Sequence, residues 1–155
     1  MKILVISDLH IPLKSDLKSL EKLNFGLYDQ IFLLGDIVDI EVLNYLENQK
    51  PILHAVYGNM DDFYIKNRLP EKLYLELFGK KIGLIHGHQT GRAIPDKLLK
   101  YFNKKIDLMV FGHSHYQEKY EIEDTLILNP GAFCEGDYAE IELNESILEI
   151  KLLHP

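Results

Sequence analysis

Three short apolar runs near the start of the chain constrain its fold most, because a helical pattern separates each run from the next. The runs are KILVIS at 2–7, QIFLLG at 30–35 and PILHAVYG at 51–58. After the first run, Leu17, Leu20 and Leu23 fall on one helical face, with Ser15 as the predicted N-cap. Residues 40–49 repeat the helical pattern after the second run. Continuous apolar runs joined through helices are typical of parallel strands buried on both faces of a sheet.

The second half of the chain changes to hairpin patterns. Residues 72–87 predict two strands around a turn at Phe78-Gly79, and Pro95 fits the first turn of a short helix. After an apolar run at 107–112, two segments alternate apolar and charged residues, which predicts an antiparallel meander with one solvated face. Their turn signals are Glu123-Asp124 and Asn144-Glu145. Two mixed sheets flanked by helices would accommodate all of these elements. We therefore expect an α/β fold, a layered α/β/β/α sandwich, in one domain over 1–155.

Composition excludes several classes of function. The 155 residues are 46% hydrophobic and 26% charged, which is typical of a globular chain. A net charge of -7 argues against bulk binding of nucleic acid or an anionic membrane, because both require basic surface. Cys134 is the single cysteine, so neither an internal disulfide nor a thiolate metal cluster is expected. With no apolar stretch of membrane-spanning length, we expect a cytoplasmic protein.

Five predicted strands each end in residues that can bind metals. The pairs, in chain order, are Asp8 and His10, Asp36 and Asp39, Asn59 and Asp61, His86 and His88, and His113 and His115. Any one of them alone is better explained as a turn residue at the end of a strand. As a set they predict a site, because ligands bind at the carboxyl ends of strands in α/β sheets.

The residue types in this set suit two divalent transition metals. Imidazole and carboxylate without sulfur favour Mn, Fe, Co, Ni or Zn over Mg and Ca, which prefer oxygen ligands alone. Two such ions, roughly 3.5–4 Å apart, need a shared ligand, and a carboxylate can bridge them. Few carboxylates then face a total metal charge of about four, so the site stays electropositive and attracts a phosphate oxyanion.

The five motifs DLH, GDIVD, GNMD, HGH and GHSH, in this order, resemble the calcineurin-like metallophosphoesterase family. The match runs from Met1 to about Pro130, and the short single-domain prokaryotic phosphodiesterases of the family look most similar. The resemblance implies a pair of sheets flanked by helices. It also implies a phosphodiesterase, with a small phosphoester as substrate and two divalent metals as cofactors, of which we expect Mn first. A hydroxide between the metals would attack phosphorus in line.

The resemblance also assigns roles to residues of this chain. One metal would take Asp8, His10 and His115, the other would take Asn59, His86 and His113, and Asp36 would bridge them. Asn59 would also contact the phosphate. Asp39, in the GDIVD motif, would support the metal ligands from behind, and Asp61 is a second candidate for that role. Each of these two aspartates is also a candidate cap for the helical segment that follows it.

One departure from the family pattern concerns the leaving group. Many members read Gly-Asn-His after the third strand, and that His assists the transition state or protonates the leaving group. This chain has Met60 there, and a thioether cannot transfer a proton. General acid catalysis is worth roughly 10²–10⁴-fold, so we expect a bias toward substrates with good leaving groups. His88 is the candidate catalytic replacement.

Other interpretations stay open. Arg92 is either a substrate-binding residue or a solvated loop arginine, His54 is expected to pack within a strand, and His154 is expected in a loose tail. SDLHIP and KIGLIHGHQ also resemble the retromer scaffold subunit of the same fold. An interaction scaffold without catalysis is therefore the alternative to an enzyme. The middle motifs, with Asp36 and Asn59 in place, favour catalysis. The sequence leaves open the natural substrate and a homo-oligomeric state.

Overall fold

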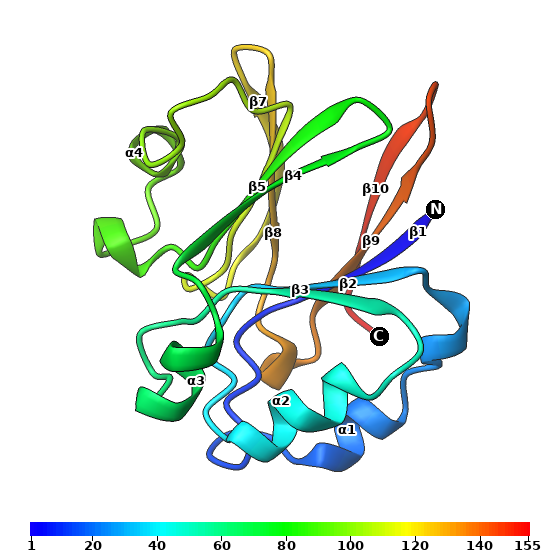
Figure 1. The fold of residues 1–155 in the computed structure, drawn as a ribbon, viewed down its shortest axis with the longest axis vertical. Helices are drawn as coiled ribbons and strands as arrows, with labels where there is room; N and C mark the ends of the chain where they lie inside the picture. Colours follow the sequence, from blue (N-terminus) through cyan, green and yellow to red (C-terminus); the bar gives the residue numbers. More distant parts are fainter.

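A computed structural model describes all 155 residues as two five-stranded sheets packed face to face (Figure 1). The first sheet has the order β10-β9-β1-β2-β3, and the second has the order β4-β5-β6-β8-β7. The strands are β1 (Lys2–Ile6), β2 (Gln30–Leu33), β3 (Ile52–Ala55), β4 (Lys72–Leu77), β5 (Lys80–Ile85), β6 (Leu108–Val110), β7 (Gln117–Ile122), β8 (Thr125–Pro130), β9 (Tyr138–Leu143) and β10 (Leu148–Leu153). Both sheets mix parallel and antiparallel pairs, so the predicted α/β/β/α architecture is confirmed.

Helices cover the outer face of each sheet. Three of them, α1 (Leu17–Glu21), α2 (Ile40–Glu47) and α3 (Phe63–Arg68), contribute buried residues to a core with β1 and β2. The fourth, α4 (Pro95–Leu99), packs through Leu98 on β5, β6 and β8. A middle core of residues from both sheets, including Val5, Phe32 and Leu84, joins the two layers. No helix of the structure is long and apolar enough to cross a membrane.

The predicted C-terminal meander is wrong. Strands β7 and β8 form one hairpin in the second sheet, where β8 also pairs in parallel with β6. Strands β9 and β10 form another hairpin in the first sheet, where β9 pairs antiparallel with β1. Alternation of apolar and charged residues reports which side of a strand is buried, but it does not report which strand lies beside it.

Local predictions about turns and caps have mixed outcomes. The β4–β5 hairpin turns at Phe78 and Gly79, whose φ angles are 50° and 75°, as the sequence predicts. The N-cap of α1 is Asp16, which accepts from the amide of Ser19, whereas the Ser15 hydroxyl donates to the carbonyl of Leu9. The prediction of Ser15 as the cap is therefore wrong. Its side chain instead closes the loop that follows β1.

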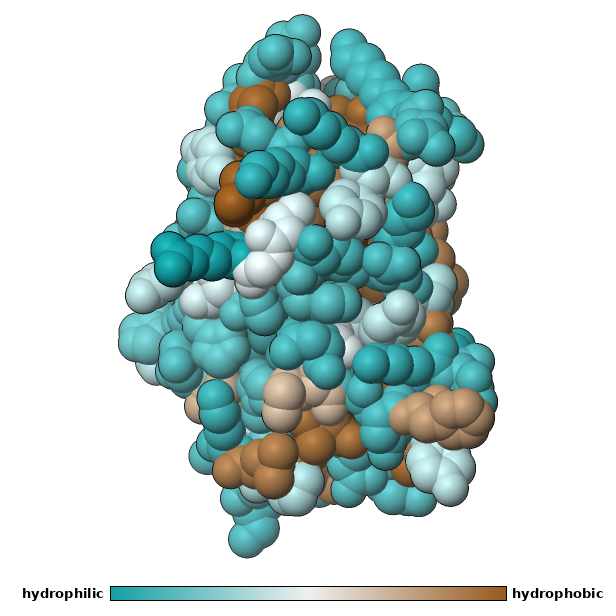
Figure 2. Space-filling view, turned by 90° about the vertical axis from the view of Figure 1, so that its left-hand side faces the viewer, coloured by the Kyte–Doolittle hydropathy of each residue, from teal (hydrophilic) through white to brown (hydrophobic).

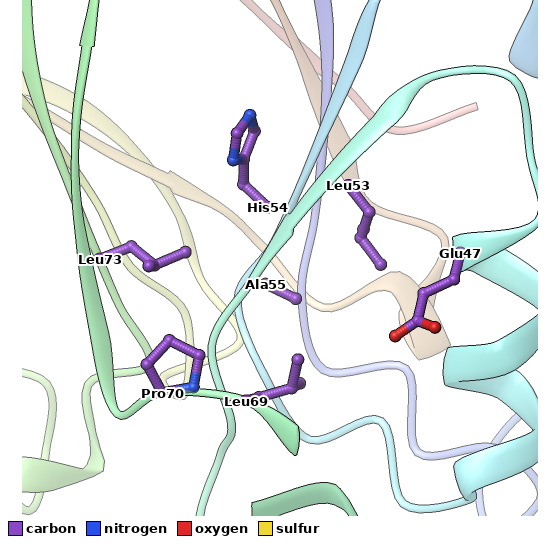
Figure 3. Close-up of a pocket in the computed structure, with 7 residues that line it drawn as sticks. All are labelled: Glu47, Leu53, His54, Ala55, Leu69, Pro70 and Leu73. Atoms are coloured by element: carbon purple, nitrogen blue, oxygen red, sulfur yellow. The ribbon is translucent and has the colours of Figure 1, made fainter.

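A cavity of about 470 Å³ lies beside β3, the edge strand of the first sheet, and Figure 3 shows the residues that line it. His54 of this strand points to the β4 side, and its ring lies edge to face on Phe32 at 5.8 Å, so the prediction of a packed strand histidine is confirmed. The lining residues are Glu47, Leu53, His54, Ala55, Leu69, Pro70 and Leu73. No predicted metal ligand lines this cavity. In the tail, Nδ1 of His154 contacts the carboxylate of Asp137 just after β10, while 67% of the His154 side chain is exposed, so the expectation of a loose segment stays a prediction.

Candidate metal centre

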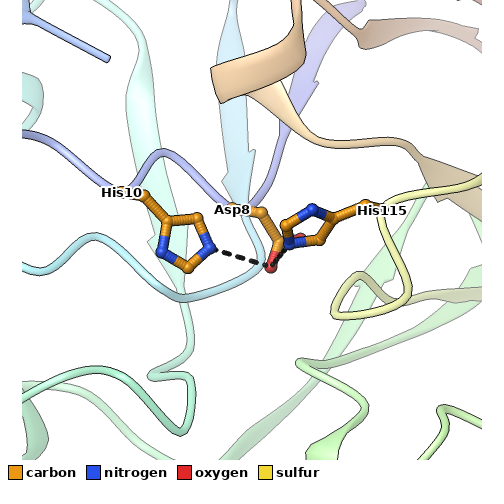
Figure 4. A group of neighbouring side chains, drawn as sticks. All are labelled: Asp8, His10 and His115. Carbon is orange, nitrogen blue, oxygen red and sulfur yellow. Dashed lines mark ion pairs between the residues drawn. The ribbon is translucent and has the colours of Figure 1, made fainter. Parts of the chain in front are cut away.

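The loops that follow five strands meet at one edge of the two sheets and bring the predicted ligands together. Two groups form there, and within each group one potential ligand atom per residue lies within 4.8 Å of the others. The first group is Asp8, His10 and His115, and the second is Asp36, His86 and His113. In the first group Asp8 lies between the two imidazoles (Figure 4). The strand-end geometry thus places six of the seven predicted ligands in two adjoining triads.

The backbone at this edge adopts an uncommon conformation. Five of the predicted ligands have a positive φ, which is rare outside glycine and costs of order 1 kcal/mol for each residue. They are Asp8 (56°), His10 (46°), Asp36 (54°), His113 (71°) and His115 (67°). The left-handed conformation lets the chain turn sharply at the end of each strand and directs the side chain into the space between the loops.

Each of the two aspartates has one oxygen held by the protein and one facing imidazole nitrogens. Oδ2 of Asp8 accepts from the Ser7 hydroxyl at 2.6 Å and from the His113 amide at 3.0 Å. Its Oδ1 lies 3.4 Å from Nε2 of His115 and 3.8 Å from Nε2 of both His10 and His86. The first oxygen fixes the carboxylate, and the second is left for a cation.

Asp36 repeats the arrangement and joins the two groups. Its Oδ1 accepts from the amide of Met60 at 2.8 Å. Its Oδ2 lies 3.2 Å from Nε2 of His86 and 3.5 Å from Nε2 of His10. Since His10 belongs to the first group and His86 to the second, one oxygen of Asp36 faces ligands of both groups.

Three of these facing atoms are buried and have no hydrogen-bond partner: Asp8 Oδ1, His10 Nε2 and His86 Nε2. Buried polar atoms are almost always paired, because an unpaired one has lost its hydration without compensation. Lone pairs of imidazole and carboxylate that face one another are compensated by a cation among them. The donor set, carboxylate and imidazole without sulfur, fits divalent transition metals.

In three histidines, the ring nitrogen that faces away from the centre contacts another group of the protein. Nδ1 of His86 donates to the carbonyl of Leu34, which leaves Nε2 for the centre. Nε2 of His113 lies 2.8 Å from the carbonyl of Gly91, which leaves Nδ1 for the centre. Nδ1 of His115 lies 3.6 Å from Oε1 of Glu135. Such contacts fix the tautomer and the ring orientation of metal-binding histidines.

The ionisable groups of the cluster shift one another's pKa values. Burial alone would raise the pKa of Asp8, but the neighbouring imidazoles of His10, His115 and His86 hold that pKa well below its ordinary value. Burial lowers the pKa of His86, but the nearby carboxylates of Asp36 and Asp8 and the carbonyl of Leu34 together outweigh burial, so the net shift is upward. The protein groups alone therefore favour ionised carboxylates with positive charge beside them, which is the charge pattern that a divalent cation would also satisfy.

The remaining predicted residues lie around these two groups. Asn59 is exposed in the loop after β3, next to Met60, whose amide contacts Asp36. The His88 ring is 5.5 Å from that of His86, and its Nδ1 is buried without a partner. Burial and the nearby charges of His86 and His113 lower the pKa of His88. Arg92 is exposed and follows Gly91.

Comparison with known proteins agrees with this geometry. A family model of the calcineurin-like phosphoesterase superfamily domain matches residues 1–149. The chain belongs to this superfamily. Among its relatives, a phosphodiesterase of Methanocaldococcus jannaschii is 28% identical over 86% of this chain and 85% of its own. A probable metallophosphoesterase of Methanothermobacter thermautotrophicus is 32% identical over 85% and 77%, respectively.

A solved structure of Vps29 from Entamoeba histolytica, complexed with Zn²⁺, is also similar to this superfamily member. It has a TM-score of 0.79 and 26% identity, and the match covers 99% of this chain and 97% of that one. The resemblance to the calcineurin-like family is therefore confirmed at the levels of sequence and fold. The family and the named relatives support a phosphoesterase hydrolase whose centre binds divalent metal ions.

Asp39 and Asp61 have different roles in this superfamily member. Asp39 is the N-cap of α2, where it accepts from the amide of Glu41, in agreement with one of the two roles that the sequence allows. Asp61 is not the cap of α3, because Asp62 fills that position. The buried carboxylate of Asp61 instead accepts four amide hydrogen bonds. Their donors are Asp36, Ile37, Val38 and Gly58. Asp61 thus fixes the loop that presents Asp36.

Asp61→Asn is expected to destabilise the protein by about 2–3 kcal/mol, because an amide oxygen cannot accept all four bonds and its NH₂ group would face buried amide donors. The measurement is the free energy of unfolding in urea. Asp62→Asn is the matched control at the next position, because Asn caps a helix as well as Asp does. Equal stability of the two variants would contradict the role assigned to Asp61.

The sequence interpretation missed the groups that hold the ligands from behind. Ser7 directly precedes Asp8, so a hydroxyl inside a buried strand end is the signal that could have revealed it. Glu135 lies in a short 3₁₀ turn at Phe133–Glu135, twenty positions from His115 in sequence, and no local pattern links the two residues. The carbonyls of Leu34 and Gly91 are backbone groups, which carry no sequence signal.

Proposed function

We propose that the protein is a dinuclear, metal-dependent phosphodiesterase that hydrolyses a small phosphoester. One observation carries the proposal: buried atoms of Asp8, His10 and His86 face one another between two adjoining triads and have no hydrogen-bond partner. Bound there, two divalent cations, of which we expect Mn first, supply Lewis acidity that activates water and stabilises charge on a phosphoryl group. The phosphodiesterase name of a relative 28% identical to the chain supports the reaction class.

The chain's own residues would hold and orient the reactants. Asp36 would hold both metals through the oxygen that faces His10 and His86, and its other oxygen stays fixed by Met60. Asn59, exposed in the loop after β3, would donate to a phosphoryl oxygen and stabilise its developing charge. His88 offers an unpartnered nitrogen beside the centre, and Arg92 an exposed cation one residue from the carbonyl that contacts His113. These two residues are the candidates for contact with the leaving group and with a further phosphoryl oxygen.

The absence of an acid at Met60 sets a condition on the substrate. Half of the Met60 side chain is exposed, in the loop where many family members carry a histidine. Because a thioether donates no proton, substrates whose leaving group departs as a stable anion are expected to react fastest.

The alternative is an interaction scaffold, and the similarity to Vps29 is the observation that favours it. The Vps29 structure holds Zn²⁺, so metal binding by itself does not separate the two functions. Turnover does. The experiment is therefore hydrolysis of bis(p-nitrophenyl) phosphate by protein purified without chelator, with its metal content measured in the same sample.

We expect about two metal equivalents per chain, turnover with added Mn²⁺, and loss of at least about 10³-fold of the activity after chelation, restored by metal. Full turnover in a chelated sample would contradict the metal-dependent mechanism. Absence of turnover with every divalent cation, in protein that binds two equivalents, would favour the scaffold.

A further inference from the structure

The four most exposed large hydrophobic side chains of the protein lie in the segments that follow the candidate ligands of the metal centre. The four highest exposures are Tyr116 at 75%, Phe63 at 70%, Tyr64 at 68% and Leu13 at 66%. Met60, at 50%, is less exposed than Ile52 and Leu27, but it lies in the loop that leads into α3. Single exposed hydrophobic residues are normal on a surface, but a concentration around one site marks a place of interaction. We call these five residues the rim.

Each rim residue is tied to the centre by the chain. Tyr116 directly follows His115, and the amide of Met60 donates to Asp36. Leu13 lies in a turn closed by the amide of Lys14 and the carbonyl of His10 at 2.7 Å. The rim therefore includes residues from the loops after three different strands.

The other two rim residues open α3. Phe63 and Tyr64 directly follow Asp61 and Asp62, and their rings contact each other edge to face at 5.9 Å. Figure 2 shows hydrophobic surface gathered in the lower part of the face it presents, the end at which α3 lies in Figure 1. The helix thus presents two aromatic side chains to solvent beside the loop that holds Asp36.

The rim and the centre together have the chemistry of a site for a substrate that is polar at one point and apolar around it. The inner groups are carboxylates and imidazoles, which suit metals and a phosphoryl group. The surrounding groups are aromatic rings and aliphatic side chains, which gain from contact with a large apolar or aromatic group and gain nothing from a small polar one. At position 60, where many family members carry a histidine that can donate a proton, this chain has the apolar side chain of Met60.

We propose that the rim selects phosphodiesters that carry an aromatic or similarly large apolar substituent over compact phosphoesters. This inference rests on the proposed function and specifies its substrate class. The substituent that stays on phosphorus lies against Tyr116 or against the Phe63–Tyr64 pair, while the phosphoryl group occupies the centre.

Two substrates with one leaving group test this selectivity. Bis(p-nitrophenyl) phosphate and methyl p-nitrophenyl phosphate both release p-nitrophenolate and differ in the substituent that remains. With Mn²⁺-loaded protein we expect kcat/KM to favour the diaryl ester by about tenfold or more. Tyr116→Ala and Phe63→Ala are each expected to reduce that preference by about three- to tenfold, through KM of the diaryl ester. Tyr120→Ala, an exposed tyrosine of β7, is the matched control and leaves the preference unchanged.

A binding measurement separates failure of this inference from failure of the proposed function. Phenylphosphonate is expected to bind the Mn²⁺-loaded protein about three- to tenfold more tightly than methylphosphonate, and Tyr116→Ala removes much of the difference. This calorimetric comparison needs no catalysis, so it tests whether the rim binds an aromatic substituent even if turnover is absent. The inference is overturned if wild type binds both phosphonates equally. It is also overturned if the rim variants lower kcat/KM for both esters alike, or change neither, as a rim reserved for a protein partner would do.

Discussion

Asp36→Asn is expected to lower kcat/KM for bis(p-nitrophenyl) phosphate by about 10³-fold or more, with at least one metal equivalent lost from the protein. The substitution keeps the shape of the side chain and removes its charge. Oδ2 of Asp36 lies 3.2 Å from Nε2 of His86 and 3.5 Å from Nε2 of His10, so it faces ligands of both triads. A neutral amide in its place cannot offset the charge of two cations.

The measurement combines steady-state kinetics with metal analysis and with unfolding in urea. Asp16→Asn is the control, because Asp16 is the N-cap of α1 and Asn fills that position equally well. We expect the control to retain the metal content and turnover of wild type. If Asp36→Asn retained both as well, a shared role for Asp36 in two metal sites would be excluded.

The parallel half of the fold is predictable because burial on both faces gives β1 and β2 a nearly continuous apolar pattern, while β3, the partly exposed edge strand, is interrupted only by His54. The C-terminal half is not predictable to the same degree. β7 and β9 follow similar alternating patterns yet belong to different sheets. Their partners, β8 and β1, are set by contacts between distant segments, which a local period of two cannot encode.

Convergence of the candidate ligands follows from one rule, that the carboxyl ends of parallel strands meet at one edge of a sheet. This rule places Asp8, Asp36 and the loop of Asn59 side by side in the first sheet, and it brings His86 to the matching edge of the second. The local patterns in the sequence do not predict how the two sheets pack face to face. The distances between the triads are therefore a result of the structure alone.

Support behind the ligands was less predictable than the ligands themselves. Asp61 lies two residues after Asn59, and its sequence context allows both a helix cap and a support of the metal ligands. Only the tertiary structure shows its carboxylate among four backbone amides. Every residue except proline carries the same backbone amide, so the sequence does not show which amides the Asp61 carboxylate binds. The same holds for the carbonyls that orient His86 and His113.

Gly58→Ala is expected to disrupt the metal centre although it substitutes none of the candidate ligands. A Cβ at this position would lie 2.2 Å from Oδ1 of Asp36 and 2.5 Å from its backbone nitrogen. Rotation of the Asp36 side chain relieves only the first clash. The clash with the backbone nitrogen displaces the backbone of a loop whose amides donate hydrogen bonds to the carboxylate of Asp61. We therefore expect a loss of about 3 kcal/mol in the free energy of unfolding, together with displacement of Asp36.

A displacement of this size is expected to reduce kcat by about 10²-fold, because phosphoryl transfer depends on ligands held within a fraction of an ångström. Gly79→Ala is the control for the glycine-to-alanine change itself. Gly79 has a φ of +75° but no atom within 4 Å of its Cβ position, so its variant loses only about 1 kcal/mol and keeps its turnover. Normal turnover of Gly58→Ala, in protein destabilised as expected, would mean that the Asp36 carboxylate tolerates displacement and that it does not bridge the two metals.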